Sequence, residues 1–304
     1  MRALTRGPGV FPECGAAMLP MSRTSILSLV LGLILLMAGC ASAPYTGRHQ
    51  LLFTSEGSET RMGYQAFQQV KRQYRVSRDP ETNALVTRVG RRIAEAAQRP
   101  DYRWEFVVLE GKEANAFCLP GGKVGVFTGI LRYTRDEAGM ATVISHEVAH
   151  ALARHAGERL SQSMLAQAGG LGLGVALGGA GSAAGSAVMQ GYSLGTQLGI
   201  LLPYSRSQEY EADHIGVILM AKAGYDPAQA LEFWRRMMAG EKGAKLPQFM
   251  STHPNDASRL KELQAFLPEA RKYYVPAREA RSLPPPAAAA PAAPVAGRWM
   301  PGGK

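Results

Sequence analysis

Two histidines and a glutamate occur in the segment 146–150, His-Glu-Val-Ala-His, and these residue types at this spacing can bind a metal ion. Residues four apart lie on one side of an α-helix, so the imidazoles of His146 and His150 can bind the same ion. A catalytic zinc ion takes three protein ligands and keeps one position for water. Glu147 could serve that water as general base and then protonate the leaving amine. The segment predicts peptide-bond hydrolysis with one Zn²⁺ per chain.

The third ligand is expected from a second helix, whose first residues 205–213 read Ser-Arg-Ser-Gln-Glu-Tyr-Glu-Ala-Asp. Glu209 and Asp213 are four residues apart and share a face. Glu209 could complete the zinc site, and Asp213 could accept a hydrogen bond from a ligand imidazole and fix its orientation. Such a helix by itself would more often present a solvated acidic face. Beside the histidine pair, the metal-site interpretation is favoured.

Substrate contacts are predicted on the strand from Gly122 to Phe127, which includes Val124. This strand could be an exposed edge that takes an extended substrate as an added strand. The alternative is an ordinary core hairpin. Asn115 could hydrogen-bond the substrate backbone from the same region.

His253 lies in an expected loop after the ligand helices and has two alternative roles. As a fourth metal ligand it would displace the water and hold the enzyme inactive, the role that we favour. As a hydrogen-bond donor it could stabilise the oxyanion, and Arg259 could serve the oxyanion too. His49, His155 and His214 are interpreted as structural or surface residues; His155, five residues after His150, would point to a different side of the helix.

The apolar periodicity and the turn residues predict the elements that hold these side chains. These are helices over about 56–76, from Asp79-Pro80, over about 136–167, over 205–223, from Asp226-Pro227 to about Met238 and from Asn255 or Asp256 to Phe266, a strand over 104–109, and a hairpin of 116–119 with 123–128.

The N-terminal region resembles a bacterial lipoprotein signal. An apolar run over residues 26–38 follows Arg23, and it is too short to span a bilayer comfortably but suits a signal-peptide core. It leads through small residues to Cys40. This resemblance implies cleavage before Cys40 and acylation of Cys40, and Ala41 after it favours the outer membrane. The alternative is an ordinary signal peptide with an incidental cysteine.

The composition of the chain bears on which classes of partner and function are expected. The 304 residues carry a formal net charge of +10 and are 46% hydrophobic, but the Lys and Arg residues are scattered, which favours a solvated basic surface. The export signal and the lack of a binding motif argue against a nucleic-acid partner. Residues 168–202 are rich in Gly and Ala and could form a lid or plug, and residues 277–304 are a Pro/Ala-rich tail expected to be disordered. Cys118 is expected to be a small apolar residue on a strand.

The motifs at 146–150 and 205–213 together resemble the zinc endopeptidases related to HtpX and the CAAX prenyl-protein proteases. Further similarity to the periplasmic LoiP- and BepA-like branch lies in Asn-Ala-Phe at 115–117, Pro-Gly-Gly at 120–122 and Ser-Thr-His-Pro at 251–254. The resemblance covers roughly residues 50–270. A LoiP-like lipoprotein is the better match, since no helical-repeat domain is expected after the catalytic domain and no convincing membrane span is seen.

The resemblance implies an α+β, mainly helical fold: a zincin-type metallopeptidase domain with a small β-sheet or hairpin beside the active-site helix. It implies zinc bound by His146, His150 and Glu209, Glu147 as catalytic acid and base, and quality control of unfolded or misassembled envelope proteins. The expected organisation is a signal peptide at 1–39, a lipidated tether at 40–54, the metallopeptidase domain at 55–276 and the tail at 277–304. The alternative function is a chaperone-like assembly lipoprotein with little proteolytic activity.

Overall fold

A computed structural model describes residues 40–176, 205–239, 247–254 and 257–276. The signal peptide, the tail and most of the expected lid therefore lie outside the described residues, and residues 168–176 continue a helix. No helix within these ranges is both long and apolar enough to cross a membrane.

The described chain is mainly helical with a small sheet, as predicted, and it has a second, two-stranded sheet among the residues expected to be a tether. In chain order the elements are β1 (Cys40–Ser42), β2 (His49–Leu51), α2 (Glu56–Gln73), α3 (Pro80–Ala97), β3 (Glu105–Leu109), β4 (Ala116–Leu119), β5 (Lys123–Phe127), the 3-10 helix η1 (Thr128–Ile130), α4 (Leu131–Thr134), α5 (Glu137–Leu152), α6 (His155–Ala176), α8 (Arg206–Lys222), α9 (Gln229–Ala239), α10 (Gln248–Thr252) and α11 (Ala257–Arg271).

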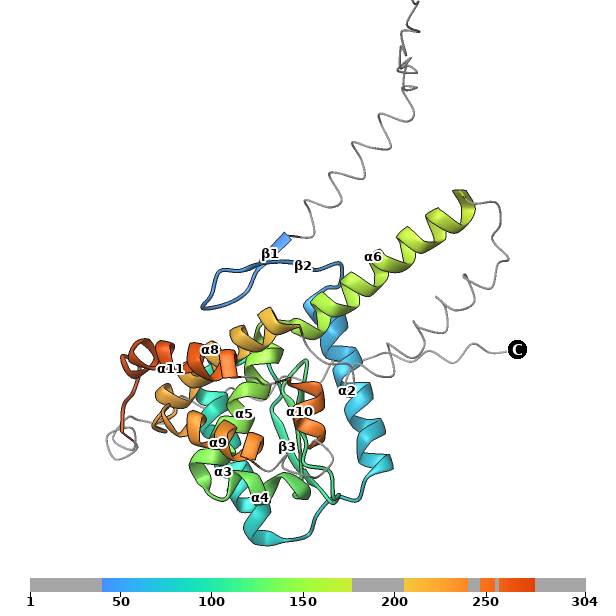
Figure 1. Ribbon diagram of the computed structural model, residues 1–304. Coiled ribbons are helices and arrows are strands. Elements are labelled where there is room, and N and C mark those ends of the chain that lie inside the picture. The colour runs from blue at the N-terminus through green and yellow to red at the C-terminus, as the bar shows by residue number, and fades with distance from the viewer. Residues whose placement is uncertain (1–39, 177–204, 240–246, 255–256, 277–304) are drawn as a thin grey trace, which may run out of the picture. The chain divides into compact units, whose positions relative to one another are not determined.

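The larger sheet has the strand order β3-β5-β4 (Figure 1). β4 and β5 form the predicted antiparallel hairpin, and β3 pairs with β5 in parallel. β5 is therefore the central strand, and all five of its residues are buried. Of the two alternatives for the strand from Gly122 to Phe127, the core hairpin is confirmed and the exposed edge is wrong. The hairpin pattern gives no sign of the long-range parallel pairing with β3.

The two faces of this sheet pack against different helices, because successive strand residues point to opposite sides. On one face, Phe117 and Phe127 pack with Phe67 and Val70 of α2. On the other face, a larger core contains Val124 and its neighbours together with apolar residues of α3 and α5. The sheet thereby holds β4 against α5.

α5 lies at the centre of the domain and packs against α3, α8, α9 and β4 (Figure 1). Every residue from Gly139 to Leu152 is buried, as expected of a helix that is covered on all sides. Asp136 caps its N-terminus by accepting a hydrogen bond from the Gly139 N–H at 2.8 Å. The predicted single helix over 136–167 is wrong, because Arg154 takes a left-handed conformation (φ 54°) and the chain turns into α6.

α8 packs closely along α5 and carries the predicted acidic residues. Ser205 and Gln208 form a capping box at its start, which satisfies two helix N–H groups. Gly216 lets the two helices approach, since a Cβ at this position would lie 3.3 Å from the backbone of His146. The contact brings the first turns of α8 beside the histidines of α5.

Candidate metal centre

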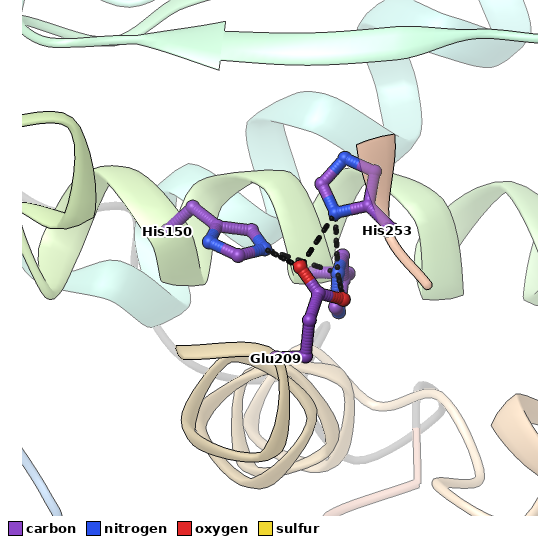
Figure 2. A group of neighbouring side chains, drawn as sticks. His150, Glu209 and His253 are labelled. Carbon is purple, nitrogen blue, oxygen red and sulfur yellow. Dashed lines mark hydrogen bonds and ion pairs between the residues drawn. The ribbon is translucent and has the colours of Figure 1, made fainter. Parts of the chain in front are cut away.

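Four buried side chains, from three parts of the chain, converge at one point between α5, α8 and α10. They are His146, His150, Glu209 and His253, and one ligand atom from each lies within 4.8 Å of all the others. In Figure 2, His150 projects from α5, Glu209 rises from α8, and His253 comes from the segment after α10. The predicted ligand set is thus brought together, with His253 as a fourth member.

The ring nitrogens that face this point are identified by short contacts. Nε2 of His146 lies 3.1 Å from Nε2 of His150 and 3.2 Å from Nδ1 of His253. The Glu209 carboxylate lies 3.3 Å from Nε2 of His150 and 3.0 Å from Nδ1 of His253. Three lone-pair donors and a carboxylate therefore crowd one small buried volume.

The charge states expected in this environment suit metal ligation. Burial lowers the pKa of His150 well below its usual value, even though Glu209 acts to raise it, so the imidazole is neutral. Burial acts to raise the pKa of Glu209, but Arg259 and His253 hold it well below its usual value, so the carboxylate is ionised. Burial acts to lower the pKa of His146 too, but hydrogen bonds to Asp213 and Glu209 outweigh it and raise this pKa, so a zinc ion would displace a proton there. Neutral imidazoles and an ionised carboxylate are the ligand forms that zinc binds.

This donor set fits a zinc ion. The three imidazole nitrogens and one carboxylate are the N and O ligands that zinc takes in a tetrahedral site. The cluster lies in the interior, where such groups without a shared partner would be costly. The convergence of His146, His150 and Glu209 agrees with the predicted ligand set, and their binding of one Zn²⁺ stays a prediction.

Glu147 follows the first ligand on α5 and is buried beside the cluster. Its Oε1 lies 3.3 Å from Nε2 of His253. Burial raises the pKa of Glu147 to about 7, opposed by His253 and by a backbone hydrogen bond from Cys118 on β4. A carboxyl group with such a pKa can accept and return a proton near neutral pH. Cys118 itself is buried on its strand, as predicted.

Asp213 and Arg259 form a charged pair behind the ligands. Oδ1 of Asp213 lies 3.2 Å from Nδ1 of His146, the contact predicted to orient a ligand imidazole. The Arg259 guanidinium holds Asp213 through Nε and, at 2.9 Å, through Nη2, and it also pairs with Glu209. It lies over the ring of Trp234, 4.3 Å from the ring centroid. The described contacts direct Arg259 at the two carboxylates, and its oxyanion role stays a prediction.

His155 is a residue of the site that the sequence did not reveal. Its side chain is fully buried, and its Nδ1 lies 2.7 Å from Nδ1 of His150. Its Nε2 lies 2.9 Å from Oε2 of Glu211. The interpretation that His155 points away from His150 is wrong, because the turn at Arg154 ends the helical periodicity on which it was based. No local sequence signal marks this turn, since it uses an arginine where glycine is usual.

The predicted substrate-binding residues are buried on and around the sheet. Gly122 precedes the central strand, and Val124 is fully buried within it. The Asn115 side chain is buried and accepts a hydrogen bond from the Ala116 N–H at 3.0 Å, while its carbonyl accepts one from Phe127. The strand that lies at the sheet edge and packs against α5 is β4. Substrate contacts by these residues stay a prediction, as does lipidation of Cys40.

Comparison with known proteins agrees with this geometry. The model of peptidase family M48 matches residues 80–267. The chain is 36% identical over 232 residues to the mitochondrial metalloendopeptidase OMA1 of Schizosaccharomyces pombe, covering 75% of this chain and 66% of that protein. It is 31% identical over 269 residues to OMA1 of Saccharomyces cerevisiae, covering 80% of this chain and 75% of that protein. It is 27% identical over 211 residues to the β-barrel assembly-enhancing protease of Escherichia coli, covering 68% of this chain and 43% of that protein.

These matches confirm the zincin-type fold class and the prediction of a metalloendopeptidase. They support a relationship to the HtpX-related proteins at the level of the family. The finer assignment to the LoiP- and BepA-like lipoprotein branch stays a prediction, since the OMA1 proteins are the more similar relatives among the three.

Replacement of Arg259 by Met tests how the buried carboxylates are held. The change leaves Asp213 and Glu209 without their cation. Removal of one partner of a buried ion pair lowers the free energy of unfolding by about 3–5 kcal/mol. We expect the free energy of unfolding, measured by urea denaturation of the metal-free protein, to fall by about that amount. As a control, Arg235→Ala breaks an exposed pair with Glu232 and should cost under about 1 kcal/mol. Equal losses in the two variants would contradict this account of Arg259.

Proposed function

Because the chain belongs to peptidase family M48, we propose that it is a zinc-dependent endopeptidase whose metal is held by His146, His150 and Glu209. The observation that carries the proposal is the convergence of these ligands, with the carboxyl group of Glu147 beside them. A structural zinc site would need no such group, because a general base serves only a reaction.

The residues around the metal centre have distinct roles in this proposal. Zinc, when bound, would polarise the scissile carbonyl group and acidify the attacking water. Glu147 takes the proton from that water at its carboxylate and gives it to the leaving amine, a sequence for which a pKa near neutrality is suited. Asp213 keeps the imidazole of His146 oriented, and Arg259 holds Asp213 and Glu209 in place.

His253 is proposed to act as an inhibitory ligand. Its Nδ1 is directed at the ligand cluster and its Nε2 at Glu147, so the ring stands between the metal position and the general base. In that place it occupies the volume that a substrate carbonyl or water would need. Withdrawal of the ring would open the site, and α10 and the segment after it are the elements that would have to move.

The substrate is proposed to be an unfolded or misassembled protein of the bacterial cell envelope. An extended segment could pair with β4, the sheet edge that packs against α5. Anchoring by a lipid on Cys40 at the periplasmic face of the outer membrane is supported by the apolar run and the small residues before this cysteine. A chaperone-like lipoprotein with little proteolytic activity is the competing function.

Glu147→Gln tests the catalytic proposal. The amide keeps the shape of the side chain but cannot accept the proton, so we expect cleavage of an unfolded model protein to fall by about 10²–10⁴-fold. Zinc content, measured by metal analysis, should stay at one ion per chain. Cleavage by the parent should also stop on addition of a chelator. Zinc-loaded protein that cleaves nothing, in the parent as in the variant and in His253→Ala, would favour the chaperone-like function.

His253→Ala separates the two roles of this histidine. If the ring blocks the site, its removal should raise the rate of cleavage of an unfolded protein several-fold, because water and substrate gain access. The rate is to be measured at saturating zinc, with the double variant Glu147→Gln, His253→Ala as the inactive control. Loss of activity in His253→Ala would overturn the inhibitory role and favour oxyanion stabilisation.

Cys40→Ala tests the lipid anchor. We expect the parent, expressed in a bacterium with labelled fatty acid, to incorporate label and to sediment with outer-membrane vesicles. The variant should lose both properties, because the acyl chains supply the membrane affinity. Cys118→Ala is the matched control and should be labelled like the parent. Label retained in Cys40→Ala would rule out this anchor.

A further inference from the structure

A continuous series of polar contacts joins the β1–β2 hairpin to the metal ligand His150. His150 contacts His155 through the two Nδ1 atoms at 2.7 Å, and His155 contacts Oε2 of Glu211 at 2.9 Å. Oε2 of Glu211 also accepts a hydrogen bond from Nε of Arg48 at 2.8 Å. The other oxygen of Glu211, Oε1, accepts one from the hydroxyl of Thr46. The residues that the sequence suggested to be a tether thus reach the ligands through two intermediates.

With neutral imidazoles, one pattern of donors and acceptors satisfies the contacts in this series. Glu211 is an ionised carboxylate and can only accept, so Nε2 of His155 must carry the hydrogen that it donates. The neutral His155 ring then has a lone pair at Nδ1, which accepts a hydrogen bond from Nδ1–H of His150. His150 is left with its lone pair on Nε2, the atom that faces His146 and Glu209.

Arg48 fixes the far end of the series. Its guanidinium forms two parallel hydrogen bonds of 2.7 Å with Glu158 and a third with Glu211. Gln208 of α8 donates a further hydrogen bond to Glu158 at 2.8 Å. Glu158 and Glu211 are buried, whereas the Arg48 side chain is 27% exposed. Arg48 therefore closes this set of interactions from the surface and supplies the charge that both buried carboxylates require.

We propose that Arg48, Glu211 and His155 are positioning residues for the metal ligand His150, and that the β1–β2 hairpin is thereby an integral part of the zinc site. The inference rests on the proposed zinc site and deepens it. Hydrogen bonds that orient a ligand imidazole also hold its metal-binding nitrogen in the required tautomer. Displacement of the hairpin would remove Arg48 from Glu211. Glu211 would then no longer fix His155, and His155 would no longer fix the orientation of His150.

The test measures binding of Zn²⁺ to the purified full chain by competition with a chromophoric chelator. Loss of such an outer contact typically weakens metal binding by about 10–100-fold. We expect a loss in this range for Arg48→Ala and for His155→Phe. His155→Asn should lie between His155→Phe and the parent, because its amide oxygen can still accept from His150. The visible spectrum of the Co²⁺-loaded protein should shift in the same variants.

Arg92→Ala is the matched control for Arg48→Ala. Its side chain is likewise 27% exposed and pairs with a single carboxylate, Glu137, at the start of α5. It should lower thermal stability without changing the dissociation constant for Zn²⁺ by more than about twofold. ¹⁵N NMR of labelled histidines in the metal-free protein gives a second readout. We expect Nδ1 of His150 to carry the hydrogen in the parent and in Arg92→Ala, and a mixture of tautomers in Arg48→Ala.

The outcomes for positioning and for peptidase function are separate. Zinc binding in Arg48→Ala equal to that of Arg92→Ala, with an unchanged His150 tautomer, would overturn the positioning role even if the parent cleaves proteins. Weakened zinc binding and a changed His150 tautomer in Arg48→Ala, while neither the parent nor His253→Ala cleaves an unfolded protein, would support the positioning role and reject the proposed reaction. If His155→Phe does not fold, Arg48→Ala and the milder Arg48→Lys decide the question.

Discussion

The constraint on which this structure depends is the burial of many ionisable groups in one place. Eight charged or imidazole side chains of the site, and the carboxylates of Glu158 and Glu211 beyond them, lie in the interior, where an uncompensated charge costs several kcal/mol. Each carboxylate is therefore matched with a cation or a hydrogen-bond donor. Arg259 serves Asp213 and Glu209, and Arg48 serves Glu211. A zinc ion would add the remaining positive charge at the point where the ligands converge.

α8 carries this balance in two directions. Glu209 and Asp213, one turn apart, face the ligand histidines, and Glu211 between them faces the opposite way, toward His155. Because the helix is buried on both sides, neither face can use water to solvate its carboxylates. The carboxylates on the two faces therefore pair with arginines that are far apart in the sequence: Arg259 of α11 and Arg48 of the hairpin. The acidic first turns of α8 are thus a scaffold between two charge networks as well as a source of one ligand.

The sequence predicted the parts of the site that are local along a helix. His146, Glu147 and His150 share α5, and the pair Glu209 and Asp213 shares α8, so a spacing of four residues was sufficient. It could not predict contacts created where helical periodicity stops. His155 returns to His150 only because Arg154 adopts a left-handed conformation, and β5 is central only because the distant β3 pairs with it. The helices were likewise predicted by their caps and apolar faces, and the β4–β5 hairpin by its turn, whereas the parallel pairing of β3 with β5 was not.

The turn at Arg154 is itself held by residues far away in the sequence. A non-glycine residue in this conformation is strained unless its surroundings compensate. The Arg154 side chain pairs with the buried Glu59 of α2 and donates to the carbonyl of Thr54 at 2.8 Å. His155 is therefore held in place by two residues: Glu59 pairs with the preceding Arg154, and Arg48 binds the Glu211 carboxylate that His155 contacts. Both Arg48 and Glu59 precede the residues matched by the family. The ligand His150 is thus oriented by a part of the chain that the metal-binding motifs do not include, so the N-terminal hairpin and α2 complete the site.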